Sequence, residues 1–134
     1  MIAAVVDASI VMGWLFAESD HPKVASAFVA VQRGEAAAPV LLYFEMRNVL
    51  LIAERRGRIT REQSAAFLNR IATLAIRMEQ PDGDETMTLA RTHNLTFYDA
   101  AYLQLARREA LPLATLDRKL ERAAVAEGVA LFGA

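Results

Sequence analysis

The chain of 134 residues contains no cysteine. This absence excludes disulfide scaffolds, thiolate metal sites and thiol nucleophiles. Histidine occurs only at His21 and His93, without the spacing of a zinc site. The six glycines are isolated from one another, so no phosphate-cradling loop is expected, and no serine stands in a nucleophile elbow. Any metal chemistry therefore depends on oxygen ligands.

Long apolar runs are also missing. No stretch approaches the ~18–20 apolar residues that a membrane span needs. Residues 2–6 are apolar, but no basic segment precedes them and Asp7 interrupts the run, so no secretory signal is expected. These absences predict a soluble, cytoplasmic protein with no membrane association.

Lysine is scarce: only Lys23 and Lys119 stand among the 15 basic residues, and the rest are arginines. An arginine fork matches the oxygens of phosphate and carboxylate better than a lysine does. A GC-rich coding bias explains the same excess equally well. The net charge of −1 provides no strong field to attract nucleic acid, so composition alone leaves nucleic-acid binding open.

What the chain does contain is an alternation of strands and helices in one domain, predicted over residues 1–134. A hydrophobic share of 54% is ample for a core. Short apolar runs predict strands at residues 2–6, 36–40, 76–79, 113–115 and 129–132. Helical spacing, caps and breakers predict helices at residues 9–17, 22–32, 41–56, 61–74, 85–93, 98–108 and 117–127, with a turn at 18–22. This order predicts an α/β fold with a parallel sheet and right-handed crossovers.

Four acidic residues occupy positions that folding alone explains poorly: Asp7, Glu45, Asp99 and Asp117. Three of them have a simple alternative explanation, because Asp7 and Asp117 could cap the helices that follow and Asp99 fits a capping box. Glu45 is harder to dismiss. It falls on a predicted apolar helix stripe with residues 42, 49 and 52, where an ionised carboxylate is costly unless it is paired or metal-bound. A buried ion pair with a distant arginine is the structural alternative.

The acids become more informative together. Asp7 and Asp117 each follow a predicted strand, so both should lie at the carboxyl edge of the sheet, where ligands bind in such folds. Gathered carboxylates repel one another unless a cation neutralises them, and oxygen ligands suit Mg²⁺. The pattern predicts a divalent-metal site. Ser9, Asn48 and Thr115 could support it through hydrogen bonds, although cap and turn chemistry explains Ser9 and Thr115 equally well.

Four motifs built around these acids resemble those of the PIN-domain ribonucleases, and among them the VapC-type toxins of toxin–antitoxin pairs. They are Val5-Val6-Asp7-Ala8-Ser9, Phe44-Glu45-Met46-Arg47-Asn48, Tyr98-Asp99-Ala100-Ala101-Tyr102 and Thr115-Leu116-Asp117-Arg118-Lys119. The resemblance covers essentially the whole chain, in order. The middle, from about Gly57 to Thr92, carries little signature.

This resemblance implies a three-layer α/β/α sandwich with a mostly parallel central sheet. It also implies Mg²⁺- or Mn²⁺-dependent endoribonuclease activity, a homodimer and inhibition by a VapB-type antitoxin. The acidic site would comprise Asp7, Glu45, Asp99 and Asp117. Ser9, Asn48 and Thr115 are assigned more loosely as supporting groups.

Within that site we expect Asp7 and Asp99 to bind the metal directly, and Glu45 and Asp117 to hold water or a second ion. RNA would be held by its backbone, with Arg118 and Lys119 as candidates, although a solvated helix face explains both residues as well.

A different class of function is also open: a catalytically silent module whose role is to bind a partner protein. The apolar side chains of Trp14, Phe16, Phe44 and Phe67 could lie under a groove for an amphipathic peptide. The simpler explanation is that they belong to the core.

Overall fold

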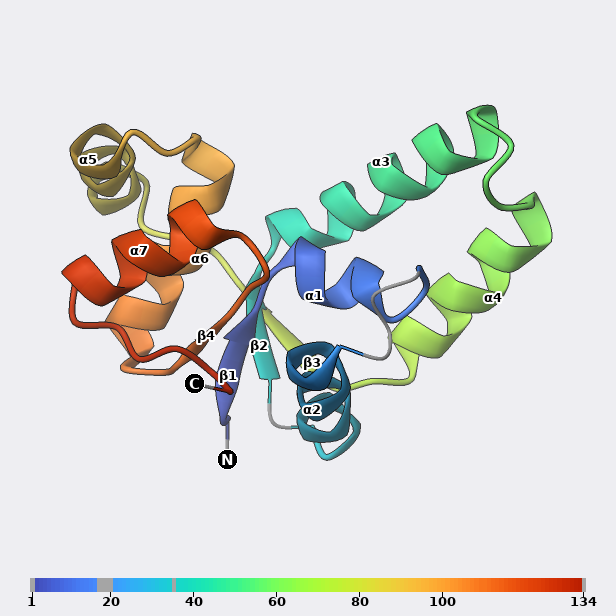
Figure 1. Cartoon of the computed structure of the whole chain (residues 1–134), viewed down its shortest axis with the longest axis horizontal. Helices are drawn as coiled ribbons and strands as arrows, with labels where there is room; N and C mark the ends of the chain where they lie inside the picture. The colour runs from blue at the N-terminus through green and yellow to red at the C-terminus, as the bar shows by residue number, and fades with distance from the viewer. Residues whose placement is uncertain (1, 17–20, 35, 134) are drawn as a thin grey trace.

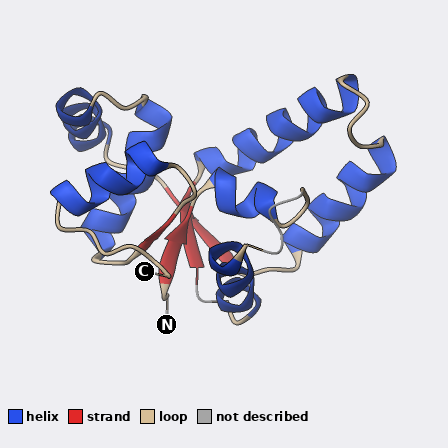
Figure 2. Ribbon diagram, viewed as in Figure 1, coloured by secondary structure: helices blue, strands red, loops and turns tan. Residues whose placement is uncertain are grey.

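The computed structural model describes residues 2–16, 21–34 and 36–133. Its described residues form a parallel sheet in the order β3-β2-β1-β4. The strands are β1 (Ala4–Val6), β2 (Ala36–Pro39), β3 (Ile76–Glu79) and β4 (Leu113–Ala114). The central strand β1 pairs with β2 on one side and with β4 on the other (Figure 2). Its three residues are almost completely buried, as expected for a strand covered on both faces.

Helices cover both faces of this sheet. They are α1 (Ala8–Gly13), α2 (Pro22–Gln32), α3 (Leu41–Arg55), α4 (Arg61–Ala72), α5 (Gly83–His93), α6 (Phe97–Glu109) and α7 (Arg118–Ala126). Figure 1 shows α1–α4 on one side of the sheet and α5–α7 on the other. This arrangement follows from right-handed crossovers, because the chain moves outward from β1 to β3 and then returns past β1 to β4. The predicted three-layer α/β/α fold is confirmed.

Local sequence signals fix most helix ends. Thr60 forms the expected capping box: its hydroxyl accepts from the Gln63 N–H at 3.1 Å, and the Gln63 side chain accepts from the Thr60 N–H at 2.8 Å. Pro22 opens α2, where its missing N–H costs nothing. Gly57 follows α3 at a φ of 71°, a left-handed conformation that glycine adopts without strain.

The core is centred on α6, which packs against the sheet. Every residue from Ala100 to Ala106 is buried. The small side chains of Ala100 and Ala101 sit among large ones such as Leu103 and Leu105, so the helix backbone can approach the alanine-rich strand β2 closely.

Two predicted elements differ in the structure. Residues 129–132 make only an isolated bridge, Leu113 to Leu131, and do not form the predicted strand. The partner strand β4 is two residues long, and only its Leu113 pairs with this segment, through hydrogen bonds with Ala130 and Phe132. Helix α1 ends at Gly13, earlier than predicted; residue 17 and most of the predicted turn, 18–20, lie outside the described residues.

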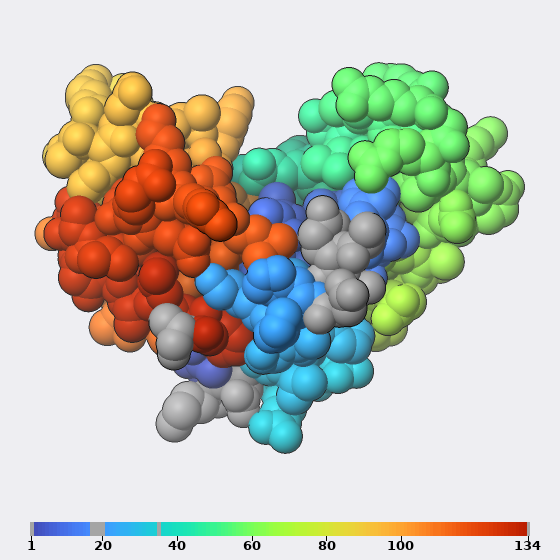
Figure 3. Space-filling model, viewed as in Figure 1, coloured from blue at the N-terminus to red at the C-terminus, as the bar shows by residue number. Residues whose placement is uncertain are grey.

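Figure 3 shows a hollow between the helices α5–α7 and the α3–α4 hairpin. The strands run toward this hollow, so their carboxyl ends lie at its base (Figures 1 and 3). Within the described residues, none of the helices has both the length and the apolar character needed to cross a membrane.

Candidate active site at the carboxyl edge of the sheet

The carboxyl ends of β1 and β4 meet where the direction of the chain through the sheet reverses. From β1 the chain leads toward β2, whereas β4 lies on the opposite side of β1. The connections after β1 and β4 therefore diverge and leave a crevice between them, the usual ligand site of such sheets. Asp7 follows β1 and Asp117 follows β4, and the Asp7 N–H donates to the Ala114 carbonyl at 3.2 Å across the junction.

Asp7 is the most buried of the four acids, with 5% of its surface exposed. One carboxylate oxygen accepts from the Ser9 hydroxyl at 2.6 Å and from the Ile10 N–H at 3.1 Å, and the other accepts from the Thr115 hydroxyl. Asp7 thus caps α1, as its simpler explanation predicts. Capping does not account for its burial, which raises the pKa of Asp7 to about 6 despite these hydrogen bonds, and the charge of Asp99 adds to the rise.

Glu45 lies at the edge of the buried face of α3, and its prediction as part of a core stripe is wrong in detail. The buried positions are Leu42, Met46, Leu50 and Ala53, whereas Ile52 is 37% exposed. An α-helix turns about 100° per residue, so the four buried positions fall within an arc of about 80°, whereas Glu45 and Ile52 lie about 60–80° outside it. Glu45 is half-buried, and burial raises its pKa.

The partner of Glu45 is a tyrosine rather than the distant arginine of the structural alternative. The Tyr102 hydroxyl donates to one oxygen of Glu45 at 2.5 Å, which joins α6 to α3. The charges of Asp7 and Asp99 raise the pKa of Glu45 further. Burial and the neighbouring carboxylates raise the pKa of Tyr102 as well, so its hydroxyl stays protonated as a donor.

Asp99 and Asp117 complete the cluster from α6 and α7. Asp99 lies in the first turn of α6, where its N–H donates to the Thr96 hydroxyl at 3.0 Å. Burial raises the pKa of Asp99, the charge of Asp117 raises it further, and Lys119 opposes the change. Asp117 caps α7 by accepting from the N–H groups of Lys119 at 2.8 Å and Leu120 at 3.1 Å. The structure thus brings the four predicted acids within electrostatic range of one another.

No ion pair neutralises this cluster among the described residues: the salt bridges there involve other carboxylates. Three carboxylates with raised pKa values therefore act on one another through their charges, and none of them forms a salt bridge among the described residues. Such a site favours either protonation or a bound cation.

The donor set is suited to a hard divalent ion, since it consists of carboxylate and hydroxyl oxygens. Within the described part of the chain, no three acidic or histidine side chains lie close enough to hold one ion together. Mg²⁺ commonly uses only one or two carboxylates and keeps several waters, so two acids are sufficient. Asp7 accepts three hydrogen bonds where a carboxylate has about four acceptor positions, which leaves one for a metal.

The three predicted supporting residues are placed differently. Ser9 and Thr115 contact Asp7 directly, and they also accept hydrogen bonds from the N–H groups of Leu116 at 2.9 Å and Asp117 at 3.0 Å. The two hydroxyls therefore tie the loop after β4 to the start of α1. Asn48 instead lies exposed on α3, one turn beyond Glu45.

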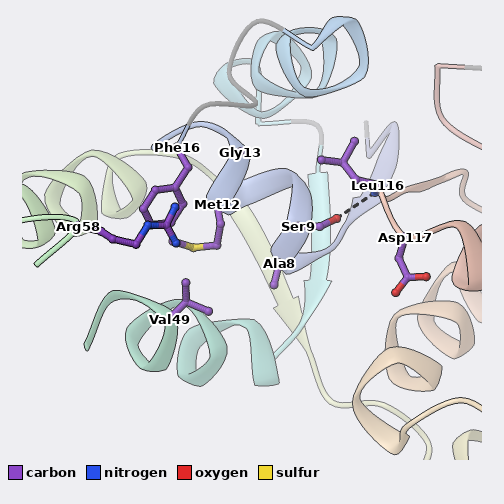
Figure 4. A pocket seen from close by; sticks show the side chains of 9 residues that line it. All are labelled: Ala8, Ser9, Met12, Gly13, Phe16, Val49, Arg58, Leu116 and Asp117. Atoms are coloured by element: carbon purple, nitrogen blue, oxygen red, sulfur yellow. Dashed lines mark hydrogen bonds between the residues drawn. The ribbon is translucent and has the colours of Figure 1, made fainter. Parts of the chain in front are cut away.

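Two pockets of about 510 Å³ flank the acids. The first, which we call the α1 pocket, has Ser9 and Asp117 on one side and Phe16 and Arg58 on the other, with Val49 below (Figure 4). The guanidinium of Arg58 lies 4.7 Å from the centre of the Phe16 ring.

The second, the aromatic pocket, is formed by residues from the starts of α3 and α6. Its lining is Leu41, Phe44, Glu45, Asn48 and Tyr98. Each pocket thus has one of the four acids in its wall.

The four apolar residues proposed to underlie one peptide groove do not share a surface. Phe67 is buried in the core, and the Trp14 indole N–H donates to the Val24 carbonyl at 3.0 Å. Phe16 lines the α1 pocket and Phe44 the aromatic pocket. The prediction of a single groove over all four is wrong, because helical spacing does not show which helices become neighbours.

Sequence reasoning missed three residues of the site. Tyr102 had a local signal, since it follows Asp99 by three residues on one helix and so lies on the same face. Lys23 and Arg58 had none. Lys23 donates to Glu121 at 2.7 Å and to the Thr115 carbonyl at 3.3 Å, contacts that join positions far apart in the chain.

A family model for the PIN domain matches residues 4–126. The chain belongs to the PIN-domain family. This confirms the family resemblance that the four acidic motifs indicated. The chain is 34% identical over 80 residues to exonuclease VapC9 of Pyrobaculum aerophilum, a match that spans 60% of this chain and 60% of that protein.

Solved PIN-like structures agree with the fold described above. The crystal structure of PAE2754 from Pyrobaculum aerophilum superposes with a TM-score of 0.74 at 27% identity, covering 91% of this chain and 79% of that one. Mycobacterium tuberculosis VapC20, described as a sarcin–ricin loop cleaving toxin, gives a TM-score of 0.62 at 14% identity and covers 90% of this chain and 95% of its own. At that identity the second likeness shows the fold alone.

Proposed function

We propose that this PIN domain is a metal-dependent endoribonuclease, the toxin of a VapBC-type toxin–antitoxin pair, formed by a single domain over residues 1–134. The observation that carries the proposal is Asp7, a buried carboxylate at the carboxyl end of β1. Its pKa is raised to about 6, and it interacts through its charge with Asp99 and Glu45. Similarity to the protein named exonuclease VapC9 supports the assignment to the VapC type.

In this proposal Asp7 and Asp99 bind the metal, and Glu45 and Asp117 hold water or a second ion. Bound Mg²⁺ or Mn²⁺ would lower the pKa of the attacking water and stabilise charge that develops on the phosphate. Ser9 and Thr115 fix the orientation of the Asp7 carboxylate through their hydroxyls.

Glu45 is the best-placed proton acceptor. It is half-buried and its pKa is raised, whereas both oxygens of Asp7 are occupied by protein donors. The Tyr102 hydroxyl holds one oxygen of Glu45 and leaves the other free to accept a proton from water. In this step the water oxygen would bond to phosphorus while the bond from phosphorus to the leaving oxygen breaks. One proton of the water would pass to Glu45, and the leaving oxygen would take a proton from solvent.

A VapB-type antitoxin is the proposed protein partner. The α1 pocket suits a peptide from such a protein, because Met12, Phe16 and Val49 offer an apolar wall while Asp117 offers a negative charge for a basic side chain. We further propose a homodimer. The exposed side chains of Leu51 and Ile52 on α3 provide apolar surface for it.

The proposal is tested by incubating total RNA with purified, partner-free protein in the presence of Mg²⁺ or Mn²⁺, with a chelator, and with the Asp7→Asn variant. We expect discrete internal fragments that require both the metal and Asp7. Release of mononucleotides would point instead to exonuclease action. Cleavage that persists in folded Asp7→Asn protein would contradict the site assignment.

A further inference from the structure

Two exposed aromatic side chains each directly precede an acid of the site. Phe44 stands before Glu45 and is 65% exposed, and Tyr98 stands before Asp99 and is 62% exposed. Neither ring packs in the core, because the buried residues of α3 do not include Phe44 and those of α6 do not include Tyr98. Exposed apolar side chains that cluster mark an interaction site more often than single ones do.

The two rings belong to one pocket. Phe44 and Tyr98 both line the aromatic pocket of about 510 Å³, together with the carboxylate-bearing Glu45 and the exposed amide side chain of Asn48. The hydrogen bond from Tyr102 to Glu45 fixes α6 against α3 and so fixes the two walls relative to each other. Whatever occupies this pocket lies directly beside the acidic cluster.

We propose that the aromatic pocket binds an unpaired base of the RNA substrate, next to the phosphate that is cleaved. This inference rests on the proposed ribonuclease function and adds a base-binding subsite to it, with Phe44 and Tyr98 as the residues that contact the base. A base can stack on an aromatic ring only when it is free of its own strand partners.

The charge of the pocket favours a base over the other parts of a nucleotide. Glu45 and Asp99 repel a phosphate, whereas a base is neutral and meets no such repulsion. Asn48 offers both a donor and an acceptor to a base edge. Aromatic faces accept any base, so the pocket selects strandedness more strongly than sequence.

A second copy of the chain fits this pocket less well. A protein surface that covered Phe44 and Tyr98 would also enclose Glu45. The Tyr102 hydroxyl donates to only one oxygen of Glu45, so burying the ionised carboxylate would be costly. Leu51 and Ile52, farther along α3, expose apolar surface that does not include an acid of the site.

The test uses full-length protein carrying Asp7→Asn, so that RNA is bound without being cleaved. The probe is a short single-stranded oligoadenylate that carries one fluorescent 2-aminopurine. Stacking on a ring quenches this fluorophore, and titration gives the dissociation constant at fixed salt. Phe44→Ala and Tyr98→Ala, alone and combined, are compared with Val125→Ala, which removes a side chain that is 64% exposed on α7.

We expect the double variant to weaken binding by about tenfold to hundredfold and to lose the quenching, since base stacking contributes about 1–3 kcal/mol. Val125→Ala should leave both unchanged, and Phe44→Trp should retain the affinity. Replacing the stacked nucleotide by an abasic one should weaken binding to the parent protein by the same factor. It should not weaken binding to the double variant any further. A double-stranded probe should be insensitive to both substitutions.

Unchanged affinity and quenching in the double variant would overturn the inference. So would a shift from dimer to monomer on gel filtration at the assay concentration, because the pocket would then be covered by a second copy. The two proposals fail separately. If the parent protein cleaves RNA with metal and the Phe44 and Tyr98 variants cleave it with the same KM, only the pocket assignment is wrong; if the parent cleaves no RNA, the ribonuclease itself is refuted.

Discussion

Replacing Asp7 by asparagine should stabilise the metal-free protein at neutral pH while abolishing the proposed activity. Asparagine has the same shape, and its carbonyl oxygen can still accept from the Ser9 hydroxyl and the Ile10 N–H. Its amide nitrogen would meet the Thr115 hydroxyl, which can accept a hydrogen bond as well as donate one. The variant therefore keeps the cap of α1 and removes the buried charge.

The magnitude follows from the pKa of Asp7, which rises from an ordinary value of 3.8 to about 6 on folding. Each unit corresponds to 1.36 kcal/mol, so the ionised carboxylate costs the folded state about 3 kcal/mol. Below the unfolded pKa the group is protonated in both states and the cost vanishes. As the pH rises through the folded pKa of about 6 the cost becomes complete, so the metal-free protein loses stability over this window.

Urea unfolding with a chelator present measures this effect at about pH 4 and about pH 7.5, on either side of the folded pKa of about 6. Asp7→Asn should exceed the parent in unfolding free energy by up to about 3 kcal/mol at the higher pH and by only about 0.5 kcal/mol at the lower. Asp82→Asn, which changes an exposed cap on α5, should alter neither value by more than a few tenths of a kcal/mol, since the two residues cap equally well. A less stable Asp7→Asn protein at about pH 7.5, or a gap that is the same at both pH values, would refute the reasoning.

Three further variants and one titration test the surroundings of Asp7. Thr115→Val removes a donor to Asp7 and should weaken Mn²⁺ binding about tenfold or more by calorimetry. Tyr102→Phe leaves Glu45 without its donor, which should raise the pKa of Glu45 further and move the acidic limb of the cleavage–pH profile upward. Lys23→Met breaks the ion pair between α2 and α7 and should lower the unfolding free energy by about 1 kcal/mol or less. Added Mn²⁺ should raise the melting temperature more at about pH 7.5 than at about pH 5, because metal and proton compete for Asp7.

The order of elements and most helix ends follow from local chemistry, and the sequence carries those signals openly. Thr60 with Gln63, Pro22 and Gly57 are examples in which one or two residues determine a boundary. The predicted edge position of Asp7 and Asp117 also follows from order alone, because parallel strands all end at one side of a sheet.

The sequence does not show which helices and strands become neighbours, so contacts between distant elements could not be predicted from it. The hydrogen bond from Tyr102 to Glu45 and the contacts of Lys23 both join distant parts of the chain. Helical periodicity misjudged Ile52 for the same reason, since only packing decides which side of a long helix is covered. The short β4 gives the last case: it pairs with residues 129–132 through Leu113 alone, so they form a single bridge in place of a strand.

The claim that these acids form a metal-dependent nuclease centre is tested most directly by diffraction from crystals grown with Mn²⁺, using the anomalous signal of the ion. We expect a peak in contact with the carboxylates of Asp7 and Asp99, and its loss in Asp7→Asn crystals. A well-diffracting crystal with saturating Mn²⁺ but no peak beside Asp7, from protein that still cleaves RNA, would contradict it.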